Sequence, residues 1–309
     1  MLTRWFLLFF ALNGSAQDSV QNVDFKIHTD VELVLLDVSV KNPGGGYVSG
    51  LTKDRFQVFE NGVPQKISEF AVADEPVAIG LVIDQSGSMA PRRTSVIEAG
   101  VAFIEGSNPQ DQIFVVNFND KVRRGLPESM PFTDDINLLR KALSIQKPEG
   151  QTALYDAIAL ALKHLENGRR QKKTLVVISD GGDTCSKRTL KEVMGLIEQS
   201  AATIYTVGLY DPDDAAESNP GVLKRIAGIS GGECFLPAEH EPILPICQKI
   251  ARDIRNRYTL GYLPIRTSDK GAVRKIRVVA SSAEKQKLIV RTRTAYRLPE
   301  RASADAISK

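Results

Sequence analysis

Cysteine and histidine are both scarce in this sequence, with three of each among 309 residues. Three cysteines are too few for a disulfide-rich scaffold, and no CxxC motif or Cys/His cluster indicates a structural zinc site. Export from the cytoplasm would still permit one disulfide. We expect Cys234 and Cys247 to form it, because a strand and the following helix could bring them together. The alternative is that all three cysteines are small buried hydrophobic residues.

Motifs for catalysis are also missing. His28, His164 and His240 fall in no metal-binding or catalytic-triad pattern. The sequence has no GxSxG nucleophile elbow, no P-loop and no GxGxxG fingerprint. We therefore expect a protein that is not an enzyme. Metal-assisted hydrolysis is the weaker alternative, because it would require a general base beside the metal.

Charge of one sign does not accumulate anywhere in the chain. The formal net charge is +3, and it falls to about +2 if Arg4 is removed with a signal peptide. No run of like charges is long enough to form a strong basic field, so nucleic-acid binding is not expected.

Long apolar runs are absent after the first residues. Arg4 is followed by the apolar stretch Trp5–Leu12 and by Gly14-Ser15-Ala16, whose small residues suit cleavage before Gln17. We therefore predict a signal peptide over residues 1–16 and an N-terminal linker over 17–30, with the protein exported to the periplasm or secreted. A buried N-terminal element and a retained anchor are the alternatives. No later segment is long and apolar enough to span a bilayer, so the mature chain is expected to lack a membrane span.

Between residues 76 and 258, apolar runs alternate with helical patterns. The first run, Val77–Ile83, is continuously apolar, as expected for a strand that is buried on both faces, and the other runs are similar to it. The predicted strands are Val77–Ile83, Ile113–Phe118, Leu175–Ser179 and Ile204–Leu209. The predicted helices are Arg93–Gly106, Ile136–Ser144, Ala153–Glu166, Leu190–Ala201 and Pro242–Arg257. This alternation predicts an α/β fold with a doubly wound, mostly parallel sheet and helices on both faces.

The flanking segments have the short periods of β-strands. In the first segment, residues 31–75, Asn61-Gly62 indicates a hairpin, with Ile67–Val72 as the return strand. The second segment spans residues 259–297, and a flexible tail is expected over 298–309. Together the segments offer about seven strands, which suits one immunoglobulin-like β-sandwich with the α/β domain inserted into it. Two separate β appendages are the alternative.

Polar residues follow two of the buried strands and precede one helix. Asp84, Ser86 and Ser88 alternate directly after the first strand, Thr152 precedes a helix, and Asp180 follows another strand. The carboxyl ends of parallel strands meet at one edge of a sheet, so these residues should lie close together. Two carboxylates and three hydroxyls are hard oxygen ligands suited to a divalent cation. Each residue alone could equally be a helix cap or a turn residue, and only their combination favours a metal site.

This combination resembles the von Willebrand factor type A family. The metal-ion-dependent adhesion site (MIDAS) of that family has the pattern Asp-x-Ser-x-Ser, then a Thr, then an Asp. The positions Asp84, Ser86, Ser88, Thr152 and Asp180 match it without substitution. The resemblance implies a Rossmann-like von Willebrand A-like domain over residues 76–258. It also implies Mg²⁺ or Mn²⁺ rather than Ca²⁺ at the site, and a partner protein that presents an Asp or Glu to the metal.

Other residues near the predicted site have weaker assignments. We expect Asp183 to lie outside the ligand set, where it supports a ligand or is solvated in its loop. Arg92 and Arg93 could steer an acidic partner, although a solvated helix start is the simpler interpretation. The flanking stretches Gly50–Phe56 and Leu260–Pro264 resemble exported bacterial proteins with von Willebrand A-related domains.

We therefore expect a metal-dependent adhesion module that captures a carboxylate of a partner protein. The alternative is a structural component of an exported complex with no metal-dependent ligand. Because the last predicted helix runs directly into the second β segment, ligation could also change the angle between the domains.

Overall fold

The computed structural model describes residues 33–72, 75–209, 218–238, 241–265, 272–282 and 286–297. The predicted signal peptide, the linker and the C-terminal tail lie outside the described residues, as do His28 and His240. Among the described residues, no helix is long and apolar enough to cross a membrane.

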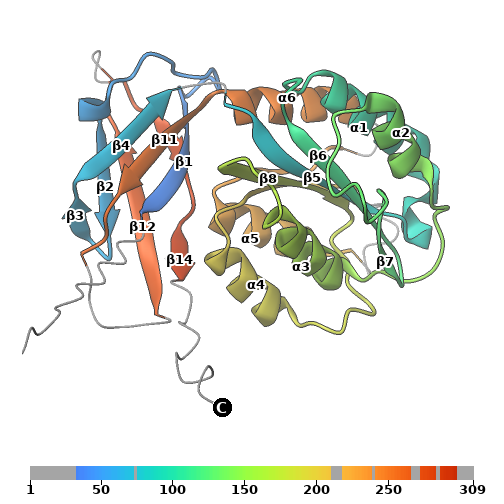
Figure 1. The fold of residues 1–309 in the computed structure, drawn as a ribbon. Coiled ribbons are helices and arrows are strands. Elements are labelled where there is room, and N and C mark those ends of the chain that lie inside the picture. Colours follow the sequence, from blue (N-terminus) through green and yellow to red (C-terminus); the bar gives the residue numbers. More distant parts are fainter. Residues whose placement is uncertain are drawn as a thin grey trace, which may run out of the picture. The chain divides into compact units, whose positions relative to one another are not determined.

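A six-stranded sheet forms the centre of the α/β part of the described chain (Figure 1). Its strand order is β10-β9-β8-β5-β6-β7, and all neighbours are parallel except the pair β6 and β7. The strands are β5 (Val77–Asp84), β6 (Gln112–Phe118), β7 (Val122–Arg124), β8 (Lys172–Ser179), β9 (Thr203–Gly208) and β10 (Cys234–Phe235). Every residue of β5 is buried, as its unbroken apolar run predicts. The mostly parallel sheet is therefore confirmed.

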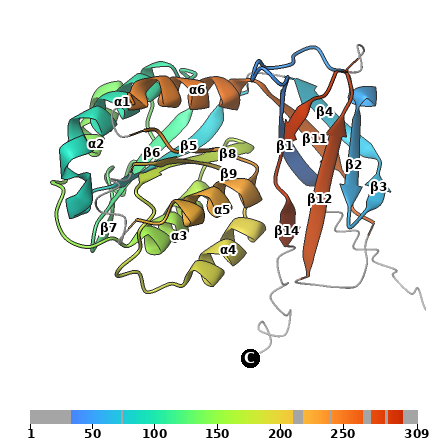
Figure 2. The same ribbon diagram turned by 180° about the vertical axis from the view of Figure 1, so that it is seen from behind.

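Helices lie on both faces of this sheet, as Figures 1 and 2 show from opposite sides. One face carries α1 (Arg93–Glu105), α2 (Ile136–Ser144) and α6 (Ile243–Arg255). The other carries α3 (Leu154–Leu165), α4 (Leu190–Gln199) and α5 (Pro220–Ser230). The sequence analysis did not predict α5. The Asn219 side chain caps its first turn by accepting a hydrogen bond from the Val222 amide.

The remaining described strands form two four-stranded antiparallel sheets, ordered β13-β1-β11-β4 and β14-β12-β2-β3. From the N-terminal side come β1 (Val34–Lys41), β2 (Phe56–Glu60), β3 (Val63–Gln65) and β4 (Ile67–Val72). From the C-terminal side come β11 (Arg257–Tyr262), β12 (Val273–Ala280), β13 (Ile289–Arg291) and β14 (Ala295–Arg297). Strands from both ends of the chain pair with each other, and the two sheets share one apolar core. An immunoglobulin-like topology for these sheets stays a prediction.

The predicted return strand of the hairpin was wrong. Asn61 and Gly62 have φ values of 49° and 83° and form a tight two-residue turn. Such a turn returns the chain at once, so β3 pairs with β2. The segment Ile67–Val72 is β4 and pairs with β11 in the other sheet.

A buried charge cluster joins α6 to the antiparallel strands. Asp253 in α6 is 1% exposed, and its carboxylate lies 2.9 Å from the Lys41 ammonium and 3.1 Å from the Arg257 guanidinium. It also accepts hydrogen bonds from the Tyr205 hydroxyl (2.5 Å) and the Ser39 hydroxyl (2.9 Å). Burial alone would raise the pKa of Asp253. The nearby Arg257 and Lys41 outweigh it and hold that pKa well below its usual range.

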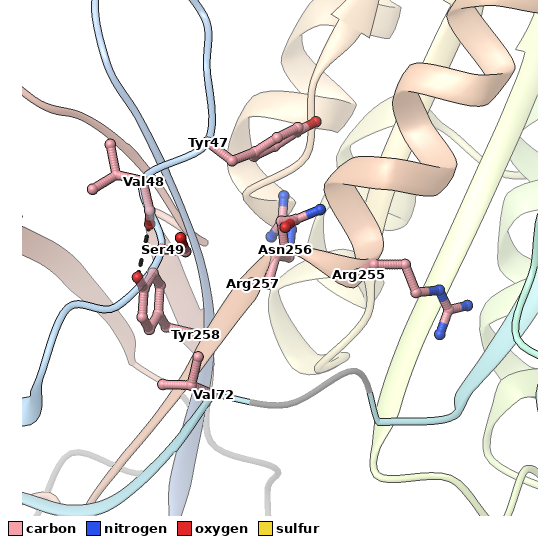
Figure 3. A pocket seen from close by; sticks show the side chains of 8 residues that line it. All are labelled: Tyr47, Val48, Ser49, Val72, Arg255, Asn256, Arg257 and Tyr258. Carbon is pink, nitrogen blue, oxygen red and sulfur yellow. Dashed lines mark hydrogen bonds between the residues drawn. The ribbon is translucent and has the colours of Figure 1, made fainter.

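Only Asn256 separates α6 from β11. Figure 3 shows this passage from helix to strand, with Tyr47 and Val48 beside it. The Tyr258 hydroxyl donates to the Val48 carbonyl oxygen (2.7 Å) and accepts from the Leu51 amide (3.1 Å). The strand that leaves α6 is therefore tied at once to the loop that follows β1.

Asp253→Asn should destabilise the protein at pH 7 by about 3 to 5 kcal/mol, because Arg257 would keep a buried charge without its carboxylate and Lys41 would keep only its ion pair with Glu233. The lowered pKa of Asp253 adds stability above its unfolded value near 4, and this contribution is lost as the pH falls below that value. The difference between wild type and variant should therefore shrink from pH 7 to about pH 3. Urea unfolding at both pH values measures it. Asp134→Asn, at an exposed position, is the control, and an unchanged difference at the two pH values would contradict the assignment.

Candidate metal-binding site

The carboxyl edge of the central sheet brings the predicted polar residues together. Asp84 is the last residue of β5, and Asp180 comes directly after β8, its parallel neighbour. The loop before α3 reaches the same edge, where the Gly87 amide donates to the Gly150 carbonyl oxygen (3.2 Å). Ser86, Ser88 and Thr152 line one pocket there.

Asp84 is buried two residues before Ser86, with 2% of its surface exposed. Its Oδ1 accepts from the Ser86 amide (2.8 Å), and its Oδ2 accepts from the Ser179 hydroxyl (2.7 Å). Burial, together with the nearby Asp180 carboxylate, outweighs these hydrogen bonds and raises the pKa of Asp84 to about 7. The carboxylate therefore lies where its charge is poorly compensated.

Hydrogen bonds between hydroxyls and a carboxylate connect the loops after β5 and β8. The Ser88 Oγ donates to Asp180 Oδ2 (2.7 Å), and the hydroxyl oxygens of Ser86 and Ser88 are 3.1 Å apart. The other oxygen of Asp180, Oδ1, accepts from the Gly182 amide (2.9 Å). Asp180 and the two serines thus form one connected cluster.

Two glycines, Gly150 and Gly181, allow the backbone conformations of the loops at this edge of the sheet. Gly150 has a φ of +80°, and a Cβ there would lie 3.1 Å from Asp120 Oδ1. Gly181 has a φ of +85°, and a Cβ there would lie 2.4 Å from the Asn219 carbonyl oxygen. A side chain at Gly181 would therefore push the Asp180 loop away from the start of α5.

Helix capping does not account for the hydroxyls. Ser86 precedes the 3₁₀ turn Gly87–Arg92 but makes no side-chain cap hydrogen bond. The residue at the cap position of α3 is Ala153, which has no capping side chain, and the Thr152 hydroxyl does not replace it. The hydroxyls of Ser86 and Thr152 are thus available for another role.

The chemistry of this donor set fits a hard divalent cation. Two aspartates and three hydroxyl residues supply oxygen ligands only. In the described part of the chain, no Lys or Arg forms an ion pair with Asp84 or Asp180. The same residues contain no group of three or more His, Cys, Asp or Glu side chains that could hold a metal. A metal at this site would therefore depend on the hydroxyls as well as the two carboxylates.

Asp183 forms hydrogen bonds with the start of α3 and with its own loop. Its Oδ1 accepts from the Tyr155 amide (3.0 Å) and from the Ser186 hydroxyl (2.6 Å), so it fastens its loop to the start of α3. Two residues of this region were not predicted. Ser179 bridges Asp84 and the Gly181 amide, and Thr184 lines the pocket. A hydroxyl directly before Asp180 was the available signal for Ser179, while Thr184 had none.

The predicted disulfide is absent, because Cys234 and Cys247 are both free. Cys247 is 1% exposed and packs into the apolar core from α6, and burial raises the pKa of its thiol to about 12. Cys234 lies in edge strand β10, opposite Thr206 of β9. Cys234 and Cys185 are only partly buried, so the alternative of small buried residues holds for Cys247 alone.

Two other side chains are also explained by packing or capping. His164 stacks against Phe114 and Phe132, with ring centroids 4.3 and 5.0 Å away, and its Nε2 lies 2.6 Å from the Pro131 carbonyl oxygen. Arg93 donates to the carbonyl oxygens of Ser144 and Gln146 at the end of α2. Arg93 is therefore held away from the role of steering a partner.

Comparison with known proteins finds one matching family model. The family model described as "von Willebrand factor type A domain" matches residues 79–182. No curated protein matches the chain. A von Willebrand factor type A structure from Catenulispora acidiphila is 15% identical over 88% of this chain and 76% of that chain, with a TM-score of 0.52.

Two other structures are similar over a smaller share of this chain. The conserved hypothetical protein BatB from Bacteroides thetaiotaomicron is 17% identical over 58% of this chain and 97% of that chain, with a TM-score of 0.47. The vWF domain of the type V pili tip protein Mfa5 from Porphyromonas gingivalis is 16% identical over 60% and 96%, also at 0.47. Residues 79–182 therefore match a von Willebrand factor type A domain, and this segment includes strands β6, β7 and β8 of the central sheet.

Proposed function

We propose that this protein is a metal-dependent binding module that captures a carboxylate of a partner protein. The observation that supports this most directly is the cluster of Asp84, Asp180 and the hydroxyls of Ser86, Ser88 and Thr152, which has no cationic side chain of the described chain paired with it. Two close carboxylates repel each other, and a divalent cation between them would remove that cost.

The charge of the donor set favours an external carboxylate as the ligand. Asp84 and Asp180 balance a divalent cation, while the hydroxyls add no charge. Asp183 accepts two hydrogen bonds from the start of α3 and from Ser186, so it is engaged away from the cluster. When bound, Mg²⁺ or Mn²⁺ would supply an electrophilic centre able to accept an Asp or Glu from a partner. Ca²⁺ suits the site less well, because it prefers more oxygen ligands than these residues offer.

Binding is favoured over catalysis by the surroundings of the site. Hydrolysis at a metal requires a general base within hydrogen-bond reach. His164 is committed to Pro131 and to the two phenylalanine rings. We therefore propose an interaction module, and we place it outside the cytoplasm, following the predicted signal peptide.

The first prediction from this proposed function concerns metal binding. Mg²⁺ or Mn²⁺ should raise the melting temperature of the wild-type protein, because a ligand that binds only the folded state stabilises it by about 2.7 kcal/mol at a hundred times its Kd. Asp84→Ala should abolish this shift. Differential scanning fluorimetry with and without chelator measures it.

Asp120→Asn is the matched control, since Asp120 is an exposed carboxylate beside Gly150 at the same edge of the sheet. This variant should keep the metal-dependent shift. An equal loss in both variants would mean that general negative charge, and not the ligand set, attracts the ion.

The second prediction concerns the external ligand. In Mn²⁺-loaded protein, acetate should displace metal-bound water and lower the enhancement of the water proton relaxation rate. Acetamide has nearly the same shape but no charge, so it should have little effect. If acetate and acetamide behave alike while Mn²⁺ still binds, carboxylate capture is wrong and only metal binding stands.

A further inference from the structure

The loop of residues 183–188 sets the start of helix α3. This helix lacks a capping side chain of its own, since Ala153 precedes it. Its first amides are instead satisfied from the 183–188 loop: the Tyr155 amide donates to Asp183 Oδ1 (3.0 Å), and the Asp156 amide donates to Ser186 Oγ (3.1 Å). In the opposite direction, Asp156 Oδ2 accepts from the Lys187 amide (2.8 Å). The position of the first turn of α3 therefore depends on this loop.

Thr184, in the same loop, contacts Thr152, the residue just before the cap position of α3. The Thr152 amide donates to Thr184 Oγ1 (3.0 Å), and the Thr184 amide donates to the Thr152 carbonyl oxygen (2.8 Å). The Cys185 amide donates to the same carbonyl oxygen (3.1 Å). Both backbone polar groups of Thr152 are thus held by the 183–188 loop, and Thr152 and Thr184 line the same pocket.

We propose that Thr184 is a positioning residue for the metal site, with its hydroxyl holding the backbone of Thr152 so that the Thr152 side chain faces the cation. The proposal rests on the proposed function, because it assumes that Thr152 is a ligand. The Thr184 side chain is the acceptor for the Thr152 amide, and without it that amide loses its partner. The Thr184 and Cys185 amides would still hold the Thr152 carbonyl oxygen, but the Thr152 amide would no longer be fixed to the 183–188 loop.

Thr184 can be compared with Thr189, a threonine that has a similar bond but no contact with the site. Thr189 Oγ1 accepts from the Glu192 amide (3.3 Å) and caps α4. Both threonines are exposed, so replacing either by valine opens no cavity in the core. Both substitutions remove a hydrogen bond from a backbone amide to a threonine hydroxyl, and only the bond at Thr184 leads to Thr152. Thr189→Val also removes the bond from its hydroxyl to the Glu192 carboxylate (2.8 Å), so it is the more severe local change.

The experiment measures Mn²⁺ affinity by isothermal titration calorimetry in the full-length protein. Thr184→Val should weaken Mn²⁺ binding by about tenfold or more, as expected when a group that orients a metal ligand is removed. Thr184→Ser keeps the acceptor and should restore the affinity to within about threefold of wild type. Thr189→Val should lower the melting temperature but leave Mn²⁺ affinity within about twofold.

A second measurement requires no metal. Hydrogen exchange in chelator should be faster over residues 150–156 in Thr184→Val than in wild type, while Thr189→Val should leave this segment unchanged. If Thr184→Val folds poorly, the comparison of Thr184→Ser with Thr184→Ala gives the same test.

The outcomes separate the two proposals. If wild-type protein binds no Mn²⁺, the proposed function fails. If wild type binds Mn²⁺, Asp84→Ala does not, and Thr184→Val binds as tightly as wild type, then only the role of Thr184 is overturned. Equal weakening in Thr184→Val and Thr189→Val would also overturn it, because the effect would then reflect general stability.

Discussion

The register between β5 and β8 determines where the two aspartates of the site emerge. The strands pair in parallel from Val77 opposite Lys172 to Ile83 opposite Ile178. The next residues are Asp84 and Ser179, whose side chains are joined by a hydrogen bond of 2.7 Å, and Asp180 follows one position later. A shift of one residue would turn the buried side chains to the opposite face and separate these partners. The apolar side chains that fix the register therefore also fix the separation of the two carboxylates.

Two buried carboxylates of the described chain, Asp253 and Asp84, differ in their cationic partners and in the direction of their pKa shifts. Asp253 is surrounded by Lys41, Arg257 and two hydroxyl donors, which hold its pKa low. Asp84 has hydrogen-bond donors but no cationic partner, and its pKa is raised to about 7. At Asp253 the charge is compensated by the protein's own side chains, and the cluster connects elements of the fold. The arrangement at Asp84 leaves an electrostatic requirement that a bound cation would meet.

Much of the α/β part could be predicted from the sequence because its signals are local. Helix α2 has the predicted bounds of Ile136–Ser144, and the apolar runs of β5 and β6 are in place to within one residue. The convergence of Asp84, Ser86, Ser88, Thr152 and Asp180 followed from the rule that parallel strands share a carboxyl edge.

The failures have a common physical origin in contacts between segments distant in sequence. Pairing of Ile67–Val72 with β11 is decided by a strand on the far side of the α/β segment, and no pattern within those six residues reveals it. The disulfide was inferred from the sequence proximity of a strand and a helix; both cysteines contact the same apolar core, but they do not form a bond. Thr184 carries no motif of its own, because its importance comes from the Thr152 backbone that it contacts.

The pairing of β1 has a consequence for how the protein reaches its folded state. Both neighbours of β1 in its sheet, β11 and β13, follow the α/β segment in the chain. As the chain is synthesised from its N-terminus, the strand Val34–Lys41 therefore exists with two open edges until β11 and β13 have been made. Pairings between such distant segments also slow folding, because a long loop must close before they form. The nascent chain thus has to keep an apolar strand from pairing with other molecules throughout the synthesis of the α/β segment.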